Sequence, residues 1–170
     1  MAFDLDYFAE PGAPACALDE DEIARICDFV LVSEGVERPC MASVTIASDE
    51  RMAELNAELR GHEAPTDVIS VECERPDDPD LAPGEPCELG DIVLAPEFIA
   101  AQAAGFGTTP ADETRIMVVH AMLHLLGYDH NDEDEALLME EREDAILAAI
   151  PTDGDLARVA IVRHGQEGNA

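Results

Sequence analysis

Lysine and tryptophan are absent from this chain of 170 residues. Nine arginines are its only strong bases, against 39 aspartates and glutamates, so the formal net charge at pH 7 is −30. A surface with this excess of negative charge repels nucleic acids and anionic membranes at long range. Because the acids are spread along the whole chain, we interpret them as an adaptation of composition, such as that of a salt-tolerant proteome, rather than as a site for a basic partner.

The sequence also lacks long apolar segments and paired cysteines. No apolar run approaches the roughly 18 residues that a membrane span needs. The first ten residues, MAFDLDYFAE, have neither the basic nor the apolar region of a signal peptide. The five cysteines form no CxxC pair, and in a reducing compartment such cysteines are usually small buried side chains. We therefore expect a cytoplasmic protein whose cysteines have no chemical role.

Length and patterning predict one α+β domain over residues 1–150, followed by a flexible tail over 151–170. Strands are grouped early and helices late, which favours a small mixed sheet of four strands packed by about five helices. A proline-rich loop over 74–86 separates the last two strands. The expected strands cover residues 2–9, 42–48, 67–72 and 89–95, and the expected helices cover 20–34, 49–60, 96–105, 110–126 and 133–150.

Helix boundaries are marked by capping residues. Asp19 and Ser48 are suited to the N-caps of the first two helices, and either Asn131 or Asp132 to that of the last. Thr109 and Pro110 match the N-cap and first position of the fourth helix. The body of that helix, RIMVVHAMLHLL, is apolar almost all round, which is typical of a helix buried in the domain. The last helix has an apolar face composed of Leu138, Met139, Ala145, Ile146 and Ala149.

Three of the five histidines lie in the segment HAMLHLLGYDH, residues 120–130. His120 and His124 are four residues apart and therefore project from one face of a helix. Gly127 allows the chain to reverse, which can bring His130 back toward them. A single histidine on an apolar helix is usually a packed core residue, but three at this spacing predict a metal site at the C-terminal end of the buried helix. Zinc suits three imidazoles that leave a fourth position for water.

The same spacing occurs in metzincin proteases, where a glutamate general base follows the first histidine. Here that residue is Ala121. A protease built in this way would lack the group that deprotonates its water, so peptide hydrolysis is the weaker interpretation.

With these residues in view, the chain resembles the YbeY family of metal-dependent endoribonucleases, which act as ribosomal RNA maturation factors. Three stretches carry the resemblance: HAMLHLLGYDH, LNAELRGHEAPTDVIS (55–70) and LGDIVLAPE (89–97). The resemblance implies an α+β fold with one zinc ion at His120, His124 and His130, and Arg60 as a catalytic arginine in the substrate cleft. It also implies ribosomal RNA and ribosomal components as partners, with a role in RNA processing and ribosome quality control.

The chemistry of the residues agrees with this resemblance. Zinc acidifies water and polarises phosphoryl oxygens, and a guanidinium can meet the negative charge of a phosphodiester through two hydrogen bonds. Asp67 and Asp129 are candidates for hydrogen-bond partners of the imidazoles, although solvated turn residues often have this composition. Arg60 could equally be an ordinary helix C-terminal residue.

Two other functions stay open at this point. One is a metal-dependent hydrolase of the protease type, and the other is a non-catalytic ribosome-assembly factor with a structural zinc. A structural zinc normally takes a fourth protein ligand, for which His62 is a candidate. The tail contains RHG (163–165), as in histidine phosphatases, and we expect this short match to be a coincidence or an extension without phosphatase activity.

Overall fold

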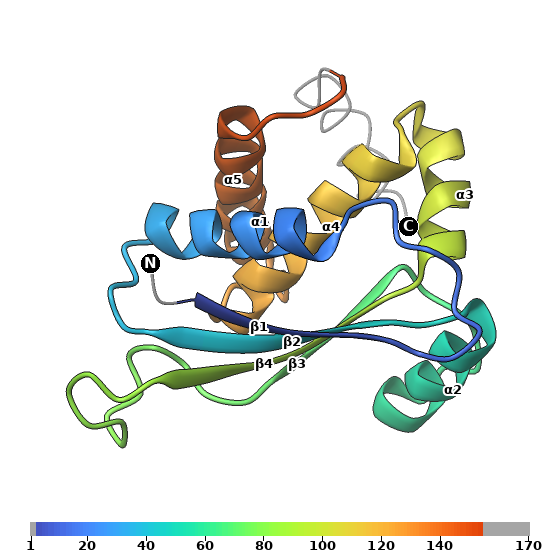
Figure 1. Ribbon diagram of the computed structural model, residues 1–170. Coiled ribbons are helices and arrows are strands. Elements are labelled where there is room, and N and C mark those ends of the chain that lie inside the picture. The colour runs from blue at the N-terminus through green and yellow to red at the C-terminus, as the bar shows by residue number, and fades with distance from the viewer. Residues whose placement is uncertain (1–2, 155–170) are drawn as a thin grey trace.

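The computed structural model describes residues 3–154, which form four strands and five helices (Figure 1). The elements follow the predicted order, with boundaries that differ from the predicted ones by a few residues. They are β1 (Phe3–Ala9), α1 (Glu20–Ser33), β2 (Cys40–Ile46), α2 (Asp49–Arg60), β3 (Val68–Glu72), β4 (Cys87–Leu94), α3 (Pro96–Phe106), α4 (Pro110–Leu125) and α5 (Glu133–Ala149).

The strands form one mixed sheet in the order β1-β2-β4-β3. β1 is parallel to β2 and β2 is parallel to β4, whereas β3 is antiparallel to β4. The β3–β4 pair is the hairpin expected across the proline-rich loop. Parallel neighbours need a long crossover connection, and α1 supplies it between β1 and β2. The predicted α+β class with a four-stranded mixed sheet is therefore confirmed.

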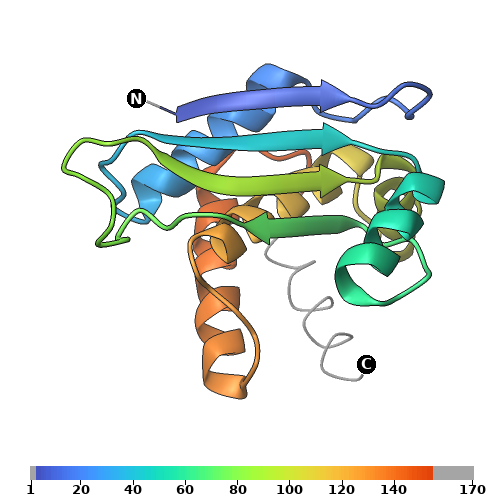
Figure 2. The same cartoon turned by 90° about the horizontal axis from the view of Figure 1, so that it is seen from below.

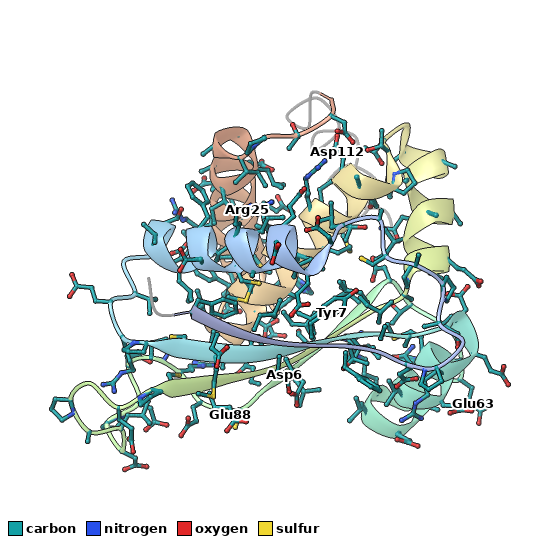
Figure 3. All side chains as sticks on the ribbon, viewed as in Figure 1. Asp6, Tyr7, Arg25, Glu63, Glu88 and Asp112 are labelled. Atoms are coloured by element: carbon teal, nitrogen blue, oxygen red, sulfur yellow. The ribbon has the colours of Figure 1, made fainter. Side chains whose placement is uncertain are left out.

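Helices α1, α3, α4 and α5 lie on one side of the sheet, and α2 lies at one end of it (Figures 1 and 2). Alternation along the strands explains this arrangement, because successive side chains point to opposite faces. In β2, Cys40, Ala42, Val44 and Ile46 are all buried on the helix side. On the opposite side, Asp6 and Glu88 point away from the helices (Figure 3). The sheet thus has one covered face and one acidic open face.

Helix α4 is the central element of the core, as its nearly continuous apolar sequence predicts. Eleven of its sixteen residues are buried, and it contacts α1, α3, α5 and the sheet. Its N-cap is Thr109, whose hydroxyl accepts a hydrogen bond from the Asp112 amide at 3.1 Å. Asp19, Ser48 and Asp132 cap α1, α2 and α5 in the same way.

The buried face of α5 differs from the predicted one. Leu138, Ala145 and Ala149 are exposed, whereas Glu143 is buried together with Met139, Ile146 and Leu147. A carboxylate within this apolar row requires a partner on the helix that it packs against. Most of the predicted tail, residues 155–170 with its RHG segment, lies outside the described residues. Within residues 3–154, no helix is long and apolar enough to cross a membrane.

Candidate metal centre

The three histidines of the HAMLHLLGYDH segment converge at the C-terminal end of α4. One nitrogen of each imidazole lies within 4.8 Å of the others. His120 and His124 come from successive turns of the helix, with ring centroids 4.5 Å apart. Gly127 then reverses the chain at a φ of 103°, a conformation that favours glycine, and His130 returns to within 5.0 Å of the His124 ring. The predicted convergence of the three side chains is confirmed.

The Nδ1 atoms of both helical histidines are hydrogen-bonded away from the cluster. His124 Nδ1 lies 2.9 Å from the carbonyl oxygen of Tyr128, and His120 Nδ1 lies 2.6 Å from a carboxylate oxygen of Glu143. A carbonyl or carboxylate oxygen only accepts, so each Nδ1 carries the hydrogen. In the neutral imidazole, the lone pair is then on Nε2, the atom that faces the centre of the cluster.

The two Nε2 atoms lie 3.0 Å apart. Burial, followed by the nearby His120 and His130, lowers the pKa of His124, which favours its neutral form. Two lone pairs facing each other at this distance repel unless a cation or a shared proton lies between them. Zn–N bonds of about 2.0–2.1 Å would place two tetrahedral donors about 3.3 Å apart, close to the distance found. The residues present therefore fit a zinc ion.

The cluster could supply three nitrogen ligands to a metal ion, and a fourth position would then remain for water. Among the described residues, no cysteine, carboxylate or further histidine joins the three imidazoles as a metal-binding group. His62 lies in the exposed segment after α2 and is outside the cluster. Three protein ligands with an open position are typical of catalytic zinc, whereas structural zinc is normally closed by four.

The hydrogen-bond partners of the imidazoles are not the aspartates considered from the sequence. Asp129 accepts from the backbone N–H of His130 at 2.8 Å and from the side-chain amide of Asn131, and the first of these bonds lowers the pKa of its carboxyl. Asp67 accepts from the Val68 amide and the Thr66 hydroxyl. Both aspartates therefore stabilise local backbone turns.

Glu143 is the residue that sequence reasoning missed. It is 7% exposed and reaches His120 from α5 across 23 residues of sequence. Its position four residues after the buried Met139 and three before the buried Ile146 places it on the apolar face, and this spacing is the signal that could have identified it. Partners of this kind fix the orientation of a ligating imidazole and raise its basicity.

Arg60 is exposed at the last turn of α2, followed by Gly61 in the left-handed conformation. No described hydrogen bond joins it to the three histidines, and α2 lies at one end of the sheet while α5 stands toward the other (Figure 2). Within residues 3–154, Arg25 and Arg60 are the arginines that make no ion pair and no hydrogen bond. The other described arginines bind acidic side chains or, in the case of Arg38, backbone carbonyls.

Comparison with known proteins identifies a matching family. Residues 16–151 match the family described as Endoribonuclease YbeY. A relative of that name from Rhodospirillum rubrum is 44% identical over 111 residues, which cover 65% of this chain and 56% of the relative. The chain thus matches little more than half of that relative's length. One from Chloroflexus aurantiacus is 37% identical over 152 residues, covering 88% of this chain and 97% of the relative.

The fold has a counterpart among solved structures. The solution structure of TM1509 from Thermotoga maritima superposes with a TM-score of 0.55 at 22% identity, covering 85% of this chain and 87% of the other. The fold and the cluster define an α+β protein with a candidate three-histidine metal centre on its central helix. Within that class, the chain belongs to the YbeY family.

Proposed function

We propose that this protein is a zinc-dependent endoribonuclease that hydrolyses phosphodiester bonds of ribosomal RNA during ribosome maturation and quality control. The activity is assigned to residues 1–150, with one zinc ion per chain, in the cytoplasm. The observation that carries the proposal is the convergence of three imidazoles, with the Nε2 atoms of His120 and His124 3.0 Å apart, His130 beside them and no fourth metal-binding group among the described residues. The names of the relatives support RNA as the substrate.

His120, His124 and His130 would hold the zinc ion. When bound, zinc supplies Lewis-acid polarisation of a phosphoryl oxygen and acidifies water for attack. Glu143 and the Tyr128 carbonyl keep the two helical imidazoles in the tautomer that presents Nε2 to the cluster. The buried Ala121, next to His120, has no carboxylate to act as the protease base, which counts against peptide hydrolysis. The open fourth position counts against a purely structural zinc.

The distribution of charge limits where RNA can approach. The open face of the sheet carries exposed acids and would repel a phosphate backbone. They are Asp4, Asp6, Glu88 and Asp91. The cluster lies on the other side, where α4 and α5 pack. Arg60, without a described acidic partner, is available to bind a phosphate of the same RNA strand through two hydrogen bonds.

Removal of the metal tests the proposed activity. Protein treated with a chelator and then desalted is expected to leave an end-labelled ribosomal RNA fragment intact, and one equivalent of zinc per chain is expected to restore cleavage. A contaminating ribonuclease of the metal-independent type would be insensitive to both steps. Cleavage that survives chelation, or that zinc does not restore, would contradict the proposal.

Replacement of Arg60 by lysine tests the role of the arginine in cleavage independently of metal binding. Lysine keeps the charge but loses the planar fork that matches a phosphate. We expect cleavage to fall about 100-fold, the scale of losing one transition-state donor, while zinc affinity stays unchanged. The measurement is kcat/KM on the same RNA fragment, beside zinc titration.

Arg51→Lys is the matched control, because Arg51 lies on the same helix and is engaged with Glu10 and Glu54. It should cleave at the wild-type rate. If the Arg60→Lys protein were as active as this control, Arg60 would be an ordinary helix C-terminal residue without a role in cleavage.

A further inference from the structure

A chain of contacts leads from His124 to the end of α1. The carbonyl oxygen of Tyr128 accepts from His124 Nδ1, and the hydroxyl of the same tyrosine donates to Glu34 Oε2 at 2.8 Å. The other oxygen of Glu34 accepts from Arg142 Nε at 2.9 Å. Glu34 is the C-cap of α1, 94 residues from Tyr128. A residue of the first helix is thus connected to a candidate metal ligand through one side chain and one peptide group.

The turn that carries Tyr128 needs such a connection. Gly127, at its start, has a φ of 103°, and glycine itself does little to hold one conformation. The turn sets two parts of the site, because the Tyr128 carbonyl orients His124 and the following residues place His130. The aromatic ring of Tyr128 is partly buried against the core, and its hydroxyl is anchored on the Glu34 carboxylate.

Glu34 is itself held firmly. Its side chain is 12% exposed, and each carboxylate oxygen has a separate partner. Arg142 also donates to the carbonyl of Ser33 at 3.4 Å, which places its guanidinium across the end of α1. The neighbour of Arg142 on α5 is Glu143, the partner of His120. Two consecutive residues of α5 therefore support the two helical imidazoles, one directly and one through Glu34 and Tyr128.

We propose that Glu34 is a positioning residue of the metal centre, which holds the Tyr128 turn so that the Tyr128 carbonyl and His130 keep the geometry that a metal ion needs. The inference rests on the proposed metal site. It does not require that the bound metal cleaves RNA. Glu34 touches neither the metal nor the substrate, and its effect passes through the hydroxyl of Tyr128.

The test removes the donor and the acceptor of the Tyr128–Glu34 hydrogen bond separately. Tyr128→Phe deletes only the hydroxyl, and Glu34→Gln leaves a single acceptor oxygen for two donors. Each variant is expected to bind Co²⁺ and Zn²⁺ about tenfold more weakly, the lower end for loss of an outer partner of a metal ligand. Because the two groups act in series, the double variant should bind no more weakly than either single one. Affinity is measured by competition with a chromogenic chelator, and the visible spectrum of bound Co²⁺ reports the ligand geometry.

Tyr7→Phe is the matched control, since Tyr7 is the other tyrosine of the chain and packs on the core from β1. It should bind both metals as the wild type does. Unchanged affinity and an unchanged Co²⁺ spectrum in Tyr128→Phe and Glu34→Gln would overturn the inference, even if both variants melted at a lower temperature. Failure of the wild type to bind either metal would instead reject the metal centre itself.

Discussion

Replacement of His124 by alanine is expected to abolish metal-dependent cleavage of ribosomal RNA and to weaken zinc binding at least about 100-fold. The change removes one of the three proposed ligands, so its effect should exceed the roughly 10- to 100-fold loss that follows removal of an outer partner. Alanine has the highest helix propensity, and His124 is only partly buried in α4, so the variant should remain folded. Zinc titration, RNA cleavage and circular dichroism on the same preparation measure the three quantities.

His62→Ala is the control for this experiment. His62 is exposed in the segment after α2 and lies outside the histidine cluster, so its loss should change neither zinc affinity nor cleavage. Equal cleavage by His124→Ala and wild type would place the activity elsewhere, for example in a contaminating ribonuclease. Zinc binding without cleavage by the wild type would shift the function toward a ribosome-assembly role or toward a requirement for a partner.

The second large effect is expected at Gly90, where the sheet leaves no room for a side chain. Gly90 lies in β4 at a φ of 141°, opposite Glu72 of β3, and a Cβ atom there would overlap the carbonyl oxygen of Val71. The Leu125 side chain, next to His124, lies 3.1 Å from the same position. Because a backbone carbonyl in a paired strand cannot move aside cheaply, Gly90→Ala should lower the free energy of unfolding by about 3 kcal/mol or more.

That loss is a large share of the roughly 5–15 kcal/mol that stabilise a typical domain. Gly105→Ala is the matched control, since Gly105 lies in α3 and a Cβ atom there meets no other atom within 4 Å. Alanine in that helix should stabilise by about 0.5–1 kcal/mol. Denaturant unfolding of the metal-free protein is the measurement that checks both changes in the free energy of unfolding. A loss below about 1 kcal/mol at Gly90 would mean that the β3–β4 pair adapts more easily than a paired backbone should.

The helices, the strands and the convergence of the three histidines were accessible to sequence reasoning because their signals are local. Capping by Asp19, Ser48 and Thr109 is decided within three residues of each cap, and the structure confirms all three. The spacing of His120 and His124 follows from one turn of helix, and Gly127 marks the reversal that returns His130. The role of Arg60 stays a prediction, since its signal came from a family resemblance and not from the physics of its neighbours.

The supporting residues of the site were decided by the tertiary structure. An acid on an apolar helix face predicts a partner somewhere, but it does not say on which element. Glu143 reaches His120 because α5 packs against α4. Glu34 reaches Tyr128 because α1 ends beside the turn that carries Tyr128. Leu138 is the opposite case, an apolar residue that the structure leaves exposed. Its hydrophobicity predicted a place on the buried face of α5, but its side chain is 52% exposed.

The sequence by itself thus determined the order of the elements, the ends of the helices and the three histidines, because each depends on residues within a turn or two of one another. The tertiary structure decided the strand order β1-β2-β4-β3, the tautomers of the imidazoles and the hydrogen bonds that hold them. The contact of Glu143 with His120 joins residues 23 positions apart, and the contact of Glu34 with Tyr128 joins residues 94 positions apart. The periodicity of a sequence predicts that a side chain is buried, but the packing of whole elements determines which residues it contacts.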